Sequence, residues 1–166
     1  MSVTQKNAHK KIPPMPFSTT EVMCINKISY LCEKIGNEKE ILKLLYTIKQ
    51  FYERQPFQLR YYRAGYELTM RNIGNLLGNI GKYEEAIEAA DSCIKLALSL
   101  QKMGNMSLAL YDKGWNMEKL WEKKLYTKKE SLVYIKVSYA LDLFLEKKKQ
   151  CKQIKNHIKK LYKEDI

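Results

Sequence analysis

The segment Gly81–Glu88, which reads G-K-Y-E-E-A-I-E, constrains the fold of this chain more than any other. Its glycine is typical of a helix end, and the aromatic residue and glutamates that follow are typical of a helix start. Ala86 supplies a small side chain where two helices must touch, and Gly74 supplies a second one on the preceding helix. These residues predict a tight antiparallel helix pair. The low counts of glycine (7) and proline (4) favour helices in the rest of the chain as well.

The composition fits one domain of 166 residues that buries its core without metals or disulfides. Every apolar run is shorter than the roughly 18 residues that a membrane helix needs. Residues 1–11 are polar and lack the apolar core of a signal peptide. The four cysteines are scattered, without a paired motif or a cysteine–histidine cluster. We therefore predict a cytoplasmic protein with no membrane span, no metal site and no redox motif.

The formal net charge of +12 is concentrated at the ends of the chain. Residues 15–122 carry 14 basic and 13 acidic side chains, whereas residues 123–166 carry 13 lysines and 5 acids. A local lysine excess can bind a nucleic acid or another polyanion in a salt-sensitive way. It is equally the ordinary solvated face of a surface helix. Both interpretations stay open on the sequence.

Hydrophobic periodicity predicts about seven helices after residues 1–17, which indicate a flexible leader or linker remnant. The helices are expected at about 18–35, 38–54, 58–80, 83–101, 106–123, 128–145 and 148–163, with a turn at 102–105. The last helix has an apolar stripe among its lysines, so that stripe must cover other residues. We expect this helix to cap the open end of a helical stack.

The stretch from Glu67 to Leu100 has the length of about 34 residues that is typical of one tetratricopeptide repeat. Its Gly74, Gly81, Tyr83 and Ala86 match the small and turn positions of that family. The chain resembles three degenerate repeats, at about 22–55, 67–100 and 107–145, followed by a capping helix at about 148–163. The resemblance implies an all-α fold, in which antiparallel helix hairpins form a right-handed superhelix over residues 18–163.

The spacing between the units is longer than the ideal repeat, and the run Leu108–Leu120 reads L-A-L-Y-D-K-G-W-N-M-E-K-L. Both features resemble the carboxy-terminal sensor domain of Xre-type helix-turn-helix regulators, including peptide-responsive regulators of Gram-positive bacteria. A helix-turn-helix domain does not fit before Ser18, so we expect a truncated regulator, a separately encoded sensor or a cloned domain. Such sensors often pair through their repeats, and the resemblance therefore implies a homodimer.

In this repeat family, ligands lie in a concave groove lined by the first helix of each pair. The corresponding positions here are Asn26, Tyr30 and Glu33 in the first unit, Arg71, Asn75 and Asn79 in the second, and Tyr111, Trp115 and Glu118 in the third. Asparagine can pair with a peptide backbone, arginine can hold a carboxylate, and aromatic rings can bury apolar side chains. The aromatic residues also fit a pure packing role, and Arg71 also fits an i,i+4 pair with Glu67.

Enzyme chemistry is not predicted. The two histidines, His9 and His157, stand apart, and no nucleophile elbow, phosphate-binding glycine loop or histidine pair is present. We expect no catalytic residue, metal or cofactor. The leading prediction is a regulatory sensor or interaction module that binds a peptide or protein segment. The alternatives are nucleic-acid or polyanion binding by the lysine-rich carboxy-terminal third, and a structural assembly adaptor.

Overall fold

The structure is a computed structural model that describes Cys24, Lys27, residues 37–54 and residues 60–165. Within that part of the chain it is all-helical, with six helices and no strand. They are α2 (Glu38–Glu53), α3 (Arg60–Asn79), α4 (Tyr83–Ser99), α5 (Met103–Glu118), α6 (Lys128–Phe144) and α7 (Lys148–Tyr162). The predicted all-α class is confirmed. The predicted leader, and the predicted helix at 18–35 apart from Cys24 and Lys27, lie outside the described residues.

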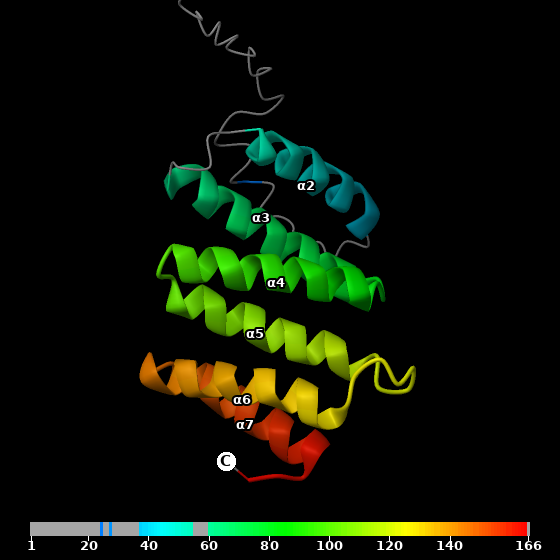
Figure 1. Ribbon diagram of the computed structural model, residues 1–166, viewed down its shortest axis with the longest axis vertical. Coiled ribbons are helices and arrows are strands. Elements are labelled where there is room, and N and C mark those ends of the chain that lie inside the picture. The colour runs from blue at the N-terminus through cyan, green and yellow to red at the C-terminus, as the bar shows by residue number, and fades with distance from the viewer. Residues whose placement is uncertain (1–23, 25–26, 28–36, 55–59, 166) are drawn as a thin grey trace, which may run out of the picture.

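Consecutive helices lie one against the next along the long axis of the molecule (Figure 1). Each helix from α2 to α7 packs against its neighbours in sequence, and α3 also contacts α5. Helices α4 and α5 join at one side of the stack, and α5 and α6 join at the other (Figure 1). Neighbours are therefore antiparallel, and α3 and α5 run in the same direction on either side of α4.

The turn between α3 and α4 forms as Gly81 predicts. Gly81 has a φ of 82°, a conformation that glycine adopts without the steric cost of a Cβ atom. The backbone N–H of Lys82 donates to the carbonyl of Leu77, and that of Gly81 donates to Gly78. This pattern is a Schellman motif, which satisfies the last carbonyls of a helix. It fixes the angle at which α4 returns along α3.

The predicted turn at 102–105 is wrong, because α5 already begins at Met103. The residue with a positive φ is Gln101 (57°), and the Lys102 N–H donates to the Ala97 carbonyl. The same Schellman pattern therefore forms around a glutamine. Gly104 belongs to the first turn of α5, where its carbonyl accepts a hydrogen bond from Lys147 Nζ at 3.3 Å.

The core runs between the helices in several clusters. The largest joins α2, α3, α4 and α5 through buried side chains such as Leu45, Ile73, Leu77 and Cys93. A second joins α6 and α7 through Leu132, Ile135, Ile154 and Ile158. The two buried isoleucines of α7 confirm that its apolar stripe packs against the rest of the chain. No helix in the described part of the chain has the length and apolar content needed to cross a bilayer.

A candidate ligand-binding pocket between α3 and α5

A pocket of about 260 Å³ lies between α3 and α5. Each of the two helices contributes two pairs of residues, and the members of each pair are one helical turn apart. The lining residues are Gly74, Asn75, Gly78 and Asn79 from α3, and Tyr111, Asp112, Trp115 and Asn116 from α5. Residues four apart lie on the same face of a helix. The pocket is therefore built from two adjacent stripes on each helix.

The glycine stripe of α3 makes the close approach to the neighbouring helices possible. A Cβ atom on Gly74 would lie 3.3 Å from Ala89 Cβ on α4. A Cβ atom on Gly78 would lie 2.8 Å from Asn116 Oδ1 and 3.5 Å from Trp115 Cζ3 on α5. Glycine at position 78 thus leaves the Asn116 amide in place at the pocket lining, where a larger residue would push it aside.

Asn116 carries an unsatisfied hydrogen-bond acceptor at this site. The residue is 3% exposed, and its Nδ2 donates to the Asp112 carbonyl at 2.8 Å. That bond fixes the orientation of the amide and directs Oδ1 towards Gly78. Among the described residues, none is a hydrogen-bond partner of Asn116 Oδ1. A buried acceptor without a partner costs about 1–3 kcal/mol, so a ligand with a donor would gain by reaching it.

A narrow crevice adjoins the pocket and extends towards α4. Its volume is about 10 Å³, which is no more than one water molecule occupies. It shares four lining residues with the pocket and adds Arg71, Ala86, Ala90, Cys93 and Ala109. Burial is the main cause that raises the pKa of the Cys93 thiol. This cysteine therefore stays neutral and has no thiolate character.

Asp112 is the only charged residue among those that line the pocket. Burial raises the pKa of its carboxyl to about 6, although the Arg71 guanidinium acts in the opposite direction. The desolvation of the carboxylate therefore outweighs its attraction to Arg71. Asp112 remains mostly ionised at neutral pH, but in a site that compensates its charge incompletely.

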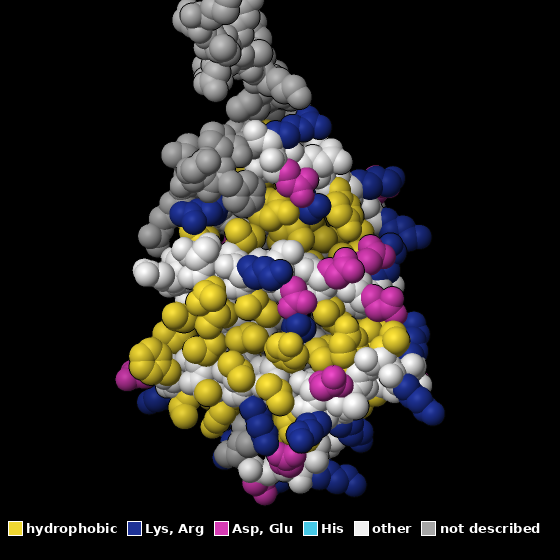
Figure 2. Space-filling model, viewed as in Figure 1, with side chains coloured by type: hydrophobic (Ala, Val, Ile, Leu, Met, Phe, Trp, Pro, Cys, Tyr) yellow, Lys and Arg dark blue, Asp and Glu magenta, His cyan; other side chains and the backbone are white. Residues whose placement is uncertain are grey.

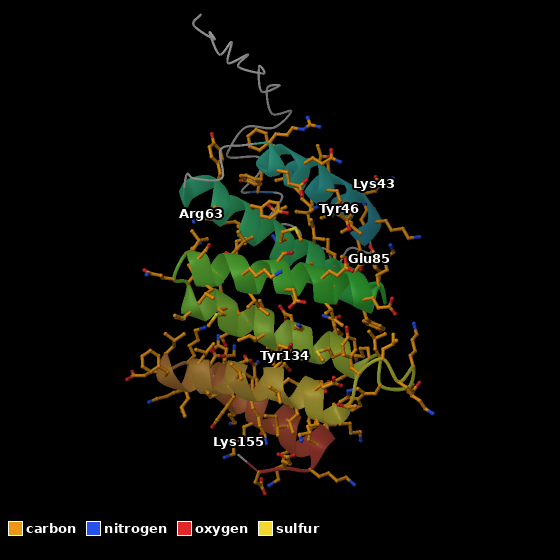
Figure 3. The ribbon with its side chains drawn as sticks, in the orientation of Figure 1. Lys43, Tyr46, Arg63, Glu85, Tyr134 and Lys155 are labelled. Atoms are coloured by element: carbon orange, nitrogen blue, oxygen red, sulfur yellow. The ribbon has the colours of Figure 1, made fainter. Side chains whose placement is uncertain are left out.

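Lys113 of α5 and Lys119, which directly follows the helix, have other partners. Lys113 reaches α4 and α6, where its Nζ is 2.6 Å from Asp91 Oδ1 and 4.3 Å from the centre of the Tyr134 ring. Figure 3 shows Tyr134 on α6, beside α5. Lys119 Nζ lies 4.5 Å from the centre of the Trp115 ring. Neither lysine lines the pocket.

The structure brings most of the predicted groove residues together. Asn75, Asn79, Tyr111 and Trp115 line the pocket, and Arg71 lines the adjoining crevice. Glu67 has other partners than the predicted Arg71. Glu67 Oε2 accepts a hydrogen bond from Asn105 at 2.8 Å and lies 3.8 Å from Lys102 Nζ. The predicted positions Asn26, Tyr30 and Glu33 lie outside the described residues.

The assignment of Glu118 to the groove is wrong, because its side chain contacts α7. Glu118 Oε1 accepts from Tyr162 at 2.6 Å and lies 2.8 Å from His157 Nε2. Glu118 is three residues after Trp115, and the helix rotation turns it towards the carboxy-terminal helix. Tyr111 also contacts this network through a 2.7 Å hydrogen bond to His157 Nδ1. Tyr111 is therefore both a pocket wall and a packing residue.

Asp112 and Asn116 are the pocket residues that the sequence interpretation missed. They follow Tyr111 and Trp115 by one position each, on the adjacent stripe of α5. The sequence did contain one signal for them. Asp112 and Asn116 are four residues apart on α5, as Gly74 and Gly78 are on α3, and polar residues at such spacing indicate a pocket more than a packed apolar contact.

The lysines of α7 form the second candidate site. Lys148, Lys149, Lys152, Lys155, Lys159 and Lys160 all lie on its exposed side. Lys155 is labelled on α7 in Figure 3. Lys159 is partly neutralised, since its Nζ lies 3.0 Å from Asp165 Oδ1. This surface is a charged helix face, and none of its lysines lines the pocket between α3 and α5.

The described residues contain no group of three or more histidine, cysteine, aspartate or glutamate side chains that could hold a metal ion. Comparison of the chain with protein-family models, with curated proteins and with solved structures gives no match.

Proposed function

We propose that this chain is a tetratricopeptide-like domain that binds a peptide or protein segment in the groove between α3 and α5. The observation that carries the proposal is the pocket of about 260 Å³, lined by Asn75, Tyr111 and Trp115. In the proposed repeat architecture, α3 and α5 are the first helices of two successive pairs. They are the helices from which a groove for an extended ligand would be built.

The chemistry of the lining suits a peptide. The amide of Asn75 offers a donor and an acceptor, as a peptide backbone requires. The rings of Tyr111 and Trp115 offer apolar surface for a side chain. A volume of about 260 Å³ is below the usual range of roughly 300–1,000 Å³ for small-molecule sites. The size favours one residue of a longer ligand over a complete small molecule.

The test is selection from a random peptide library, with Asn75→Leu compared with Asn156→Leu. Both asparagines are exposed and helical, on α3 and α7 respectively. Loss of the Asn75 hydrogen bonds is expected to weaken the selected peptides by at least about fivefold, from about 1 kcal/mol for one bond. Asn156→Leu should leave their affinity unchanged. Equal binding by both variants, or no enrichment by the wild type, would refute the proposal.

The proposal includes a homodimer formed through the exposed apolar surface of α6. Val133, Val137 and Phe144 are 53%, 45% and 81% exposed. Figure 2 shows hydrophobic side chains gathered over α5 and α6. An exposed apolar area of this kind is typical of a contact surface between proteins. Val137→Glu should convert a dimer to a monomer in light scattering, and a monomeric wild type at high concentration would exclude this part of the proposal.

The sensor role in the cytoplasm, the absence of catalysis and the place of the domain in a regulator rest on the sequence resemblance. A helix-turn-helix reading frame beside the gene would support that context. The alternative, polyanion binding, is favoured by the exposed lysines of α7. It predicts a steep fall in affinity for single- or double-stranded DNA as salt rises. Affinity for DNA that is absent, or flat with salt, would leave the groove as the functional site.

A further inference from the structure

We propose that the pocket binds a primary ammonium group of the peptide, held by the Asp112 carboxylate and Asn116 Oδ1 beside the Trp115 ring. The inference rests on the proposed peptide-binding function and goes further, because it names the chemical group that enters the pocket. Two parts of a peptide carry this group, the side chain of lysine and a free amino terminus. Both present three N–H donors on a single positive charge.

The pocket lining contains a hydrogen-bond acceptor without a partner in the described part of the chain. Asn116 is 3% exposed, and its Oδ1 has no partner among the described residues. The nearby Asp112 carboxylate is an acceptor only, without a donor, when it is ionised. The hydrogen bond from Asn116 Nδ2 to the Asp112 carbonyl fixes the amide, so Oδ1 cannot be exchanged for a donor without losing that bond. A ligand that donates several hydrogen bonds fits these groups, and a ligand carboxylate does not.

The charge of the pocket lining also favours a cationic ligand. The chain has a formal net charge of +12, yet the pocket lining holds one carboxylate and no cation. Arg71 lies in the adjoining crevice, and its attraction does not offset the desolvation that raises the pKa of Asp112. A second positive charge would stabilise the ionised carboxylate further. A neutral donor would satisfy Asn116 and leave Asp112 as it is.

The arrangement of the groups at the pocket lining also favours a compact ammonium. At position 78 a Cβ atom would lie 2.8 Å from Asn116 Oδ1 and 3.5 Å from Trp115 Cζ3, so glycine leaves both groups in place at the pocket lining. Lys119 Nζ already lies 4.5 Å from the centre of the Trp115 ring, so this ring offers the ligand apolar contact beside the Asp112 carboxylate. An ammonium has three donors, and the two oxygens of the Asp112 carboxylate together with Asn116 Oδ1 supply three acceptors. A guanidinium has five donors in a planar fork, which exceeds the acceptors that converge here.

The binding should depend on pH through Asp112. Three titratable groups interact electrostatically with Asp112: Arg71 on α3, Cys93 on α4 and Tyr111 on α5, whose pKa is raised to about 12 mainly by burial. Arginine stays charged, and the raised pKa of Cys93 keeps its thiol neutral. With a pKa of about 6, Asp112 is about nine-tenths ionised at pH 7 and about one-tenth ionised at pH 5. The affinity for an ammonium should therefore fall about tenfold over that interval.

The test uses four peptide libraries that differ only in their amines. One has free amino termini and lysine, one is acetylated and keeps lysine, one has free termini and norleucine for lysine, and one has neither amine. Wild-type protein should bind at least one amine-containing library about tenfold more tightly than the amine-free library. The second and third libraries identify which amine enters. Equal binding of the amine-free library would overturn the inference.

Variants separate this inference from the proposed function. Asp112→Asn should reduce binding of the preferred library to the amine-free level and abolish its pH dependence. Asn116→Ala should weaken the same library while keeping the pH dependence. Asp91→Asn, which removes a carboxylate paired with Lys113 outside the pocket, is the matched control and should change neither. If Asp112→Asn binds as wild type while Asn75→Leu does not, the groove stands and the ammonium site is refuted. If no library distinguishes wild type from Asn75→Leu, the proposed function itself fails.

Discussion

Replacing Asp112 by asparagine should make the protein more stable at neutral pH. The carboxyl pKa rises from 3.8 to about 6 because burial penalises its charged form more than Arg71 favours it. A difference of roughly two pKa units corresponds to about 3 kcal/mol at 1.36 kcal/mol per unit. Asparagine has nearly the same shape and carries no charge. The free energy of unfolding of Asp112→Asn should therefore exceed that of the wild type by about 3 kcal/mol at pH 7.5.

The pH dependence of that gain provides the sharper measurement. The folded-state pKa of Asp112 lies above its unfolded value, so the native state binds more protons between about pH 4 and 6. This carboxyl makes the wild type lose stability as the pH rises through that window, whereas the asparagine variant lacks this loss. Urea unfolding followed by circular dichroism should show the difference growing from near zero at pH 3.5 to its full value at pH 7, if the fold persists at the acid end.

Asp91→Asn is the control for this measurement. Asp91 is 42% exposed and pairs with Lys113, so its removal should cost no more than about 1 kcal/mol. The reasoning about Asp112 would be refuted if its asparagine variant were no more stable than the wild type at pH 7.5. It would also be refuted if the gain were the same at every pH, since a gain of that kind comes from packing and not from ionisation.

Three further substitutions test the packing and capping of the helices. Gly114→Ala should lower the free energy of unfolding, measured in urea, by about 1–3 kcal/mol, because its Cβ would lie 2.9 Å from the Ser131 carbonyl oxygen. Gly104→Ala should cost less, because its Cβ would meet the flexible end of the Lys147 side chain. A larger loss for Gly104→Ala than for Gly114→Ala would contradict the close approach of α5 and α6. Thr127→Ala should cost about 1 kcal/mol in the same assay, because Thr127 forms a capping box at the start of α6, and Thr127→Ser should restore most of it. Ile158→Ala should cost about 2–5 kcal/mol and speed hydrogen exchange in α7, since Ile158 is fully buried; unchanged exchange there would contradict the packing of α7.

The helix positions could be predicted from the sequence wherever a local signal marked them. Gly81 marked the end of α3 because its positive φ favours glycine. The start of α5 was misplaced because Gln101 adopts the same conformation, at φ 57°, without the residue type that would announce it. One hydrogen bond from the Lys102 N–H to Ala97 and one from the Gln101 N–H to Leu98 close that turn onto the end of α4. Local propensity was a weak guide at this position.

The pocket could be predicted only in part. Asn75, Tyr111 and Trp115 were found because they share a helix face with the positions that the resemblance implies. Asn116 faces Gly78 of α3, and Asp112 lines the same pocket; both relations depend on the distance between two helices, which a single-helix pattern does not contain. Glu118 was misplaced because the sequence did not show that α7 returns beside α5 and binds the carboxylate.

The glycine stripe of α3 has a consequence for protein engineering. A glycine inside a helix is less favourable than alanine by roughly 1 kcal/mol, so positions 74 and 78 are obvious targets for raising thermal stability. At Gly78 the added methyl group would meet Asn116 Oδ1 at 2.8 Å and the Trp115 ring at 3.5 Å. A stability screen would therefore be drawn to a residue whose small size keeps Asn116 and Trp115 in place at the pocket lining. A library of thermostable variants should be screened for binding before it is screened for melting temperature.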